Sequence, residues 1–208
     1  METAPSIAPE AAVYTERSSC RACHAHEPGG LEPMLDLGVQ YLPRFVAEPD
    51  PALPKAPLLL TRCRSCGLLQ LGHTIDPDLL YREFWYRSAV NDTMRNALRD
   101  LADECLRHQS SGHWLDIGAN DGYLLQCVPK RFLRTACEPA RNFREELEAS
   151  ADTVVSEYFS AETCPGRYDV ITSAAMFYDL NDPDRFVADI ARVLTADGIW
   201  VNQLNDAA

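Results

Sequence analysis

The sequence Trp114-Leu115-Asp116-Ile117-Gly118-Ala119-Asn120-Asp121-Gly122-Tyr123-Leu124-Leu125 carries the strongest structural signal in the chain. A short apolar run ends at an acid, crosses a turn that contains two glycines, and resumes as an apolar segment. This order predicts a buried strand, a tight turn and the start of a helix. The glycines would let a ligand approach the backbone, as nucleotide-type cofactors do at the end of a parallel strand. A plain strand-turn-helix corner without a ligand is the alternative interpretation.

Beyond this turn, apolar strands alternate with helical segments, which is typical of a parallel α/β sheet with right-handed crossovers. Asp182 and Pro183 fit the N-cap and first position of the last helix. Apolar residues at helical spacing after Asn91 predict an earlier amphipathic helix that buries Cys105. We expect strands at 114–117, 133–138, 153–157, 168–174 and 199–204, and helices at 122–131, after Pro139 (with Phe143 and Leu147 inward) and at 184–195 (with Phe186, Val187, Ile190, Ala191 and Leu194 inward).

Polar residues at the ends of the first two expected strands indicate which cofactor fits. Glu138 follows the glycine turn by about 20 residues, where a carboxylate usually holds a ribose diol. Asp116 can orient the turn or meet an ammonium group. Asn120 and Asp121 bring an amide and an acid to the helix entrance, which suits a cationic sulfonium better than a pyrophosphate. The pattern therefore favours S-adenosylmethionine (SAM) over a dinucleotide, whose Gly-x-Gly-x-x-Gly spacing the turn does not have.

Two Cys-x-x-Cys pairs near the N-terminus, Cys20 with Cys23 and Cys63 with Cys66, offer four thiolates to a tetrahedral Zn²⁺ ion. The long stretch between the pairs is tolerable because loop-closure entropy grows only logarithmically with length. A redox pair or ordinary thiols are the alternatives, but the βαβ setting of a redox motif is missing from the pattern. Short strands at 35–38, 58–62 and 67–71 predict a small β-rich module that the metal stabilises. His24 and His26, beside the first pair, could substitute for a ligand, but four cysteines already close the site, so we expect them to be exposed bystanders.

Composition narrows the class of protein. A net charge of −12 argues against a nucleic-acid partner. No apolar run approaches the roughly 18 residues needed to span a membrane. Residues 1–16 lack the basic and apolar regions of a secretory signal. With no such signal, the eight cysteines are expected to be thiols or metal ligands, so we expect a soluble cytoplasmic protein.

Four regions follow from these patterns. We expect a disordered lead-in at 1–17, a zinc-binding domain at 18–80, an aromatic linker and helix at 81–110, and a partial SAM-binding Rossmann-like domain at 111–208. The aromatic linker has two interpretations. It is either a hinge packed by large side chains or a lid that directs the hydroxyls of Tyr86 and Ser88 toward the cofactor.

The segment from Asp116 to Gly122 resembles the first motif of SAM-dependent methyltransferases. Together with the two cysteine pairs, the Tyr-x-Arg-Ser linker and Glu138-Pro139-Ala140, it resembles the zinc-containing sugar C-methyltransferases, from about Cys20 to Gln203. The resemblance implies a class I SAM methyltransferase fold and C-methylation of a nucleotide-linked keto sugar in deoxysugar or antibiotic pathways. In that reaction a base removes the proton beside the ketone, and the enolate attacks the methyl group of SAM.

The chain departs from that family in one respect. Family members are considerably longer, and their His-Glu-His segment for proton transfer lies outside the matching region. We therefore expect an incomplete sheet whose open edge is covered by a second copy or by a C-terminal domain. Tyr86 and Tyr178 are the candidates for chemistry, whereas His108 and His113 are expected at the surface. The alternative function is a non-catalytic SAM-binding chain or zinc module that needs a partner.

Overall fold

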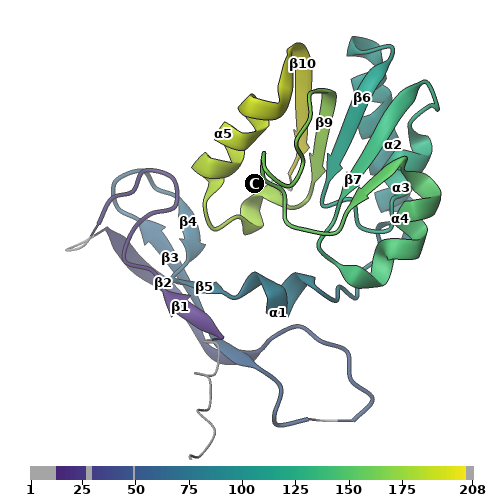
Figure 1. The fold of residues 1–208 in the computed structure, drawn as a ribbon. Coiled ribbons are helices and arrows are strands. Elements are labelled where there is room, and N and C mark those ends of the chain that lie inside the picture. Colours follow the sequence, from purple (N-terminus) through teal and green to yellow (C-terminus); the bar gives the residue numbers. More distant parts are fainter. Residues whose placement is uncertain (1–12, 27–29, 49, 205–208) are drawn as a thin grey trace, which may run out of the picture. The chain divides into compact units, whose positions relative to one another are not determined.

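The computed structural model describes residues 13–26, 30–48 and 50–204 (Figure 1). The chain divides between Leu80 and Tyr81 into two compact units. Of the expected disordered lead-in, residues 1–12 lie outside the described part. The expectation is wrong for β1 (Tyr14–Glu16), which pairs antiparallel with β5 (His73–Ile75). Main-chain hydrogen bonds to a strand nearly sixty residues later hold this segment in place. No local sequence pattern indicates so distant a partner.

The first unit is built on an antiparallel sheet in the order β2-β3-β4, with β2 at Leu31–Tyr41, β3 at Lys55–Cys63 and β4 at Leu69–Leu71. The first two strands are longer than the expected segments. The pairing of β2 with β3 contains two bulges, one beside Pro33 and one around Gly38. The bulges let the pairing continue beyond residues that do not fit a regular strand. A single helical turn, α1 (Pro77–Tyr81), follows β5.

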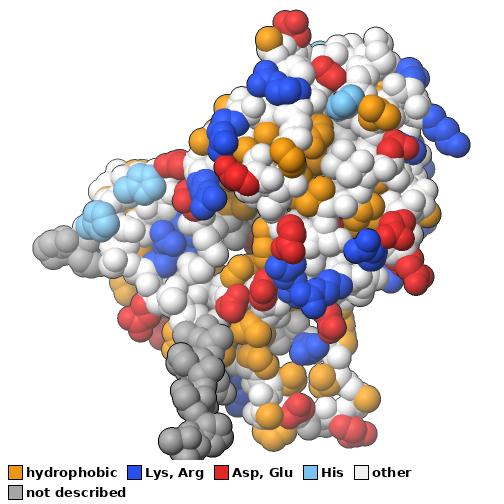
Figure 2. Space-filling view, in the orientation of Figure 1, with side chains coloured by type: hydrophobic (Ala, Val, Ile, Leu, Met, Phe, Trp, Pro, Cys, Tyr) orange, Lys and Arg blue, Asp and Glu red, His pale blue; other side chains and the backbone are white. Residues whose placement is uncertain are grey.

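Much of the apolar surface of this first unit is exposed to solvent. Figure 2 shows hydrophobic side chains at the surface around the β2–β3 ribbon, where Val39 is 64% exposed and Phe45 in the connecting loop is 78% exposed. So small a unit buries little apolar surface, and an additional stabilising element is expected. On the face shown, acidic and basic side chains are interspersed. Among the described residues, no helix is both long and apolar enough to cross a membrane.

The second unit contains a five-stranded, all-parallel sheet in the order β10-β9-β6-β7-β8 (Figure 1). β6, the strand that leads to the glycine turn, lies at its centre. Within the described residues β10 pairs only with β9, so the sheet is open at that edge, as expected from the sequence. The strands are β6 (Gly112–Ile117), β7 (Phe132–Cys137), β8 (Thr153–Val155), β9 (Tyr168–Ala174) and β10 (Leu194–Gln203).

Helices cover both faces of this sheet, as a parallel sheet requires. α2 (Asp92–His108), α3 (Tyr123–Cys127) and α4 (Arg144–Ser150) pack on one face, and α5 (Pro183–Val193) packs on the other. Along β6 the side chains alternate between the two cores, with Trp114 facing the first and Leu115 facing the second. Cys105 is fully buried in the first core, so its assignment as a core residue is confirmed.

Two helix predictions need correction. The helix expected at 122–131 ends at Cys127, because Pro129 disfavours helical backbone at the residue before it and Val128 is extended. In α5, Val187 is 42% exposed and Ala191 is also exposed, although both were expected inside. The buried stripe is instead Phe186, Asp189, Ile190 and Val193. Asp182 does cap this helix, since its carboxylate accepts a hydrogen bond from the Arg185 N–H at 3.0 Å.

The glycine turn depends on left-handed backbone at three positions. Gly118, Asn120 and Gly122 have φ values of 71°, 51° and 77°. At Gly122 a Cβ atom would lie 2.1 Å from the Ser150 hydroxyl oxygen on α4, whereas at Gly118 the nearest atom would be the Met176 side chain at 3.4 Å. Gly122 is therefore required by helix packing as well as by its positive φ. Both glycines were expected to let a ligand approach the backbone, but the neighbouring atoms are compatible with that role only at Gly118.

Replacing these glycines should separate the two effects. Gly118→Ala is expected to cost about 1–2 kcal/mol of unfolding free energy through its left-handed backbone alone. Gly122→Ala should cost a further ~1–3 kcal/mol because the new methyl group overlaps Ser150. Urea unfolding of the single variants and of Gly122→Ala/Ser150→Ala measures this. The double variant should recover part of the loss, and strict additivity of the two substitutions would contradict the packing explanation.

Candidate functional site

Four cysteine thiols in the first unit form a compact cluster. The sulfur atoms of Cys20, Cys23, Cys63 and Cys66 lie within 4.8 Å of one another. The Cys20–Cys66 and Cys23–Cys63 sulfur distances are 3.7 Å and 3.5 Å. Zn–S bonds of about 2.3 Å place tetrahedral sulfurs about 3.8 Å apart, so the donor set fits a Zn²⁺ ion. In the described part of the chain this is the sole cluster of three or more such groups, and neither His24 nor His26 belongs to it.

Tight turns present the thiols of both pairs. The Gly67 N–H donates to the Cys63 carbonyl at 2.9 Å, and Gly67 itself has a φ of 81°. In the first pair, His24 donates from its backbone to the Cys20 carbonyl at 3.1 Å. Burial raises the pKa of the Cys20 thiol, but hydrogen bonds from backbone N–H groups and neighbouring thiols outweigh it and lower the pKa to about 6. A thiolate is the form that binds zinc.

Arg21, inside the first cysteine pair, ties that pair to the chain after the second. Its guanidinium donates to the Gln70 side chain at 3.0 Å, to the Leu71 carbonyl at 2.8 Å and to the His73 carbonyl at 3.0 Å. The sequence analysis did not single out this residue. An arginine between two metal-ligating cysteines carries no motif of its own, and its partners lie about fifty residues away in the sequence.

Metal content tests the zinc assignment. We expect about one zinc ion per wild-type chain by atomic absorption, and well under one for Cys63→Ser, because three thiolates leave the tetrahedral site open. Cys127→Ser in the second unit is the matched control and should keep its metal. A wild-type chain with little zinc and four freely titratable thiols at Cys20, Cys23, Cys63 and Cys66 would refute the assignment.

In the second unit, the carboxylate of Glu138 joins the ends of β6 and β7. It is 7% exposed and accepts hydrogen bonds from the Asn120 N–H at 2.8 Å and the Ala140 N–H at 2.9 Å. Burial raises its pKa, and the two N–H donors oppose that shift. The Cys137 carbonyl accepts from Gly118 at 2.9 Å. A carboxylate offers about four acceptor positions, so two remain that could bind a diol.

Asp116 lies deeper, at the end of β6. It is 3% exposed, and its carboxylate accepts a hydrogen bond from the Thr172 hydroxyl on β9 at 2.7 Å. The same hydroxyl accepts from the Trp114 indole N–H at 3.0 Å. Burial raises the pKa of Asp116 from 3.8 to about 7, with Thr172 opposing the shift and Glu138 adding to it. Asp116 thus bonds Thr172, a partner that the sequence did not reveal, and its expected role in orienting the turn stays a prediction.

The Asp116 carboxyl should make stability depend on pH. Because its folded pKa is raised to about 7, the folded chain binds the extra proton between about pH 4 and pH 7, and unfolding free energy should fall as pH rises through this window. In urea titrations Asp116→Asn should flatten this part of the profile. Asp152→Asn should leave it unchanged, since Arg134 holds the pKa of the Asp152 carboxyl below its usual range. An identical slope for wild type and Asp116→Asn would mean that another group titrates.

Asn120 and Asp121, expected to contact the cofactor, use their side chains differently. Asn120 accepts from the Ser88 N–H at 2.9 Å and donates to the Tyr86 carbonyl at 3.0 Å. Asp121 accepts from the Ala89 N–H at 2.8 Å and from the Tyr123 N–H at 3.3 Å. Both side chains therefore hold the aromatic linker against the glycine turn, which brings Ser88 to the turn through its backbone.

The two tyrosines proposed for chemistry are partly exposed. The Tyr86 hydroxyl accepts a long hydrogen bond of 3.4 Å from the Asn91 side chain. Tyr178 lies in the 3₁₀ turn Phe177–Asp179 after β9 and is 55% exposed. Burial and the neighbouring Asp179 carboxylate raise the pKa of Tyr178. At neutral pH its hydroxyl is therefore protonated and can donate a hydrogen bond.

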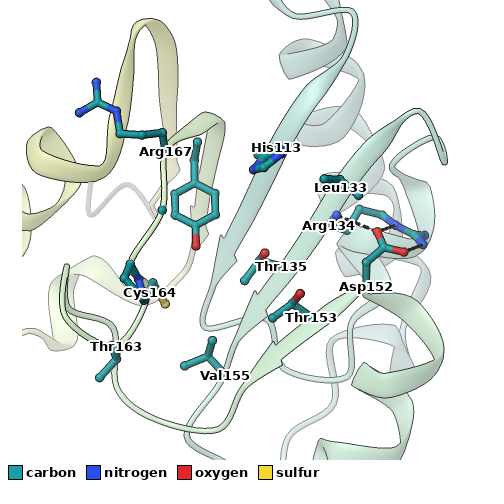
Figure 3. A pocket seen from close by; sticks show the side chains of 13 residues that line it. His113, Leu133, Arg134, Thr135, Asp152, Thr153, Val155, Thr163, Cys164 and Arg167 are labelled. Carbon is teal, nitrogen blue, oxygen red and sulfur yellow. Dashed lines mark hydrogen bonds and ion pairs between the residues drawn. The ribbon is translucent and has the colours of Figure 1, made fainter.

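A cavity of about 470 Å³ lies elsewhere in the second unit (Figure 3). Leu133, Thr135 and Val155 line it from β7 and β8, and segment 163–168 forms the opposite wall. The Arg134–Asp152 ion pair, at 3.2 Å, lies at one side. The cavity includes the first half of β7, whereas ligands of open α/β sheets bind at the carboxyl ends of the strands. No residue expected at the cofactor site lines it. His113 does line it and is exposed.

Comparisons with known proteins agree with this architecture. Residues 20–81 match a family described as a zinc binding domain, and residues 86–205 match the methyltransferase domain family. The second match spans more than half of the 208 residues, so the chain belongs to the methyltransferase domain family. Its second unit has the class I SAM methyltransferase fold, and the first unit is a zinc-binding domain. Both sequence-based expectations about fold class are therefore confirmed.

Individual relatives are distant. The C-methyltransferase NovU of Streptomyces niveus is 23% identical over 154 residues, which are 69% of this chain but 37% of that protein. The plantazolicin methyltransferase BpumL, solved with a pentazolic desmethylPZN analog and S-adenosylhomocysteine (SAH), is 18% identical with a TM-score of 0.47 over 55% of this chain and 49% of that one. A SAM-dependent methyltransferase from Methanococcus maripaludis is 17% identical with a TM-score of 0.45 over 55% and 59%.

Proposed function

We propose that this chain binds SAM at the glycine turn between β6 and α3. The observation that carries the proposal is the pairing of that turn with a buried carboxylate, Glu138, at the end of the neighbouring strand. Ligands bind at the carboxyl ends of the central strands in sheets of this type. The match to the methyltransferase domain family, over residues 86–205, includes both the turn and Glu138.

Each part of the proposed site has a role that its surroundings support. Glu138 has two acceptor positions left for ribose hydroxyls. The left-handed backbone at Gly118 leaves space beside the chain that a side chain would fill. Asp116 is buried with its pKa raised to about 7, accepts a hydrogen bond from the Thr172 hydroxyl through one oxygen, and has a second oxygen that could meet an ammonium group. Ser88 belongs to the wall that the linker forms beside the turn.

We further propose a SAM-dependent C-methylation of a nucleotide-linked keto sugar or a similar small molecule. When bound, SAM supplies an electrophilic methyl group. Tyr86 and Tyr178 are the candidate catalytic residues of this chain. A protonated Tyr178 hydroxyl would donate a hydrogen bond to the oxygen of a forming enolate, and such positioned donors stabilise developing negative charge. NovU is a C-methyltransferase, and its similarity to this chain supports methyl transfer to a carbon atom.

A second candidate function is SAM binding without turnover by this chain alone. The alignment with NovU covers 37% of that protein, so most of its length has no aligned counterpart here. In this alternative a C-terminal domain or a second copy would supply the proton-transfer group and cover the open edge at β10. Methyl transfer from labelled SAM to nucleotide-linked keto sugars by the purified chain would exclude it.

We also place the protein in the cytoplasm as part of the proposal. None of the eight cysteines is paired in a disulfide, and four of them gather at the zinc site, which fits a reducing compartment.

Calorimetry with SAH tests cofactor binding. We expect measurable heat for the wild-type chain and a Kd at least about tenfold higher for Glu138→Gln, because a charged acceptor for two hydroxyls is lost. Gly118→Arg should abolish binding by filling the space beside the turn. The matched control is Glu162→Gln, an exposed glutamate that pairs with Arg192.

Thermal unfolding of every variant distinguishes lost binding from lost structure. No heat with wild-type protein would overturn the proposal. Equal heats for wild type and a folded Gly118→Arg variant would place the ligand away from this turn.

A further inference from the structure

We propose that Asn142 and Asn120 are positioning residues that fasten residues 82–90, here called the strap, as a preformed wall of the cofactor site. The strap runs from the end of α1 to the start of α2 and has little regular structure. The inference deepens the proposed function and rests on it, because it gives the strap a role in binding SAM.

Asn142, in the 3₁₀ turn Arg141–Phe143 that precedes α4, holds the first half of the strap. It accepts a hydrogen bond from the Phe84 N–H at 3.0 Å and donates to the Phe84 carbonyl at 2.9 Å. One amide side chain thus satisfies both backbone groups of a single residue, as a neighbouring strand would. The Arg141 N–H also donates to the Arg82 carbonyl at 3.0 Å. These contacts place the strap beside the segment that follows Glu138.

Asn120 holds the second half of the strap. Its side chain receives the Ser88 N–H and reaches the Tyr86 carbonyl, and Asp121 receives the Ala89 N–H. The backbone of Asn120 is itself held in left-handed conformation by the Glu138 carboxylate. The strap, the glycine turn and the ribose-binding candidate are therefore linked in one chain of hydrogen bonds.

Side-chain contacts add to this fastening. Arg87 pairs with Glu146 on α4, and its guanidinium lies 5.1 Å from the centre of the Phe143 ring. Arg82 pairs with Glu157 at 3.0 Å. A mobile lid would instead show few contacts that hold its backbone. All of these contacts are made by residues of the chain itself, and preorganisation of this kind would reduce the entropy lost on binding.

Substitution of Asn142 distinguishes the positioning of the strap from direct contact with the cofactor. The Asn142 side chain bonds the two backbone groups of Phe84, whereas Asn120 belongs to the turn itself. A variant at position 142 should therefore weaken SAM binding through the strap, with the residues of the glycine turn and Glu138 unchanged. A merely structural residue would lower thermal stability without changing the affinity of the folded protein.

Limited trypsin digestion measures the strap directly, since the Arg87–Ser88 bond lies within it. In Asn142→Ala and Asn120→Ala we expect cleavage at this bond to rise about tenfold relative to wild type, because two backbone hydrogen bonds are lost and cleavage follows the open population. Asn142→Asp keeps an acceptor for the Phe84 N–H and should give an intermediate rate. Asn96→Ala, an exposed asparagine on α2 that pairs with Arg99, is the matched control.

The same variants are titrated with SAH by calorimetry, at a temperature where unfolding scans show them folded. We expect the Kd of Asn142→Ala to rise in step with strap cleavage. Unchanged cleavage at Arg87–Ser88 would overturn the fastening role. Faster cleavage with an unchanged Kd would overturn the positioning role. If wild type bound no SAH, the proposed function and the cofactor role of the strap would fail, while the digestion would still report on the fastening.

Discussion

The second unit depends on one buried carboxylate. Glu138 receives N–H groups from the turn after β6 and from the backbone after β7, so it joins two strand ends that the sheet brings together. A buried carboxylate is stable only while such donors are present, since its desolvation is costly without them. The left-handed turn, the asparagine that projects from it and the strap beyond that asparagine all take their positions from this contact.

The two units reach stability by different means. In the second unit, a central strand whose side chains alternate between the two cores organises apolar packing on both faces of the sheet. In the first unit, the small antiparallel sheet leaves apolar residues such as Val39 exposed. Four thiols at the zinc site and the guanidinium of Arg21 hold its turns together. A metal-ligand set is the economical solution when a segment is too short to form a core.

The sequence predicted those parts that depend on local periodicity or a dense motif. The run from Trp114 to Gly122 and the strand at 168–174 were readable because burial on both faces leaves an apolar signature. The roles of Asn120 and Asp121 were not readable, because their partners lie 32 residues earlier and the same residue types also suit a sulfonium. β1 and Arg21 were missed for the same reason: their partners are remote in sequence.

The guanidinium of Arg21 has a consequence for how the first unit handles its metal. It donates to three groups between positions 70 and 73, so hydrogen bonds as well as the ion hold the first cysteine pair beside the second. These bonds offset part of the entropy of closing the long loop between the pairs. A larger share of the zinc-binding free energy would then remain for holding the ion.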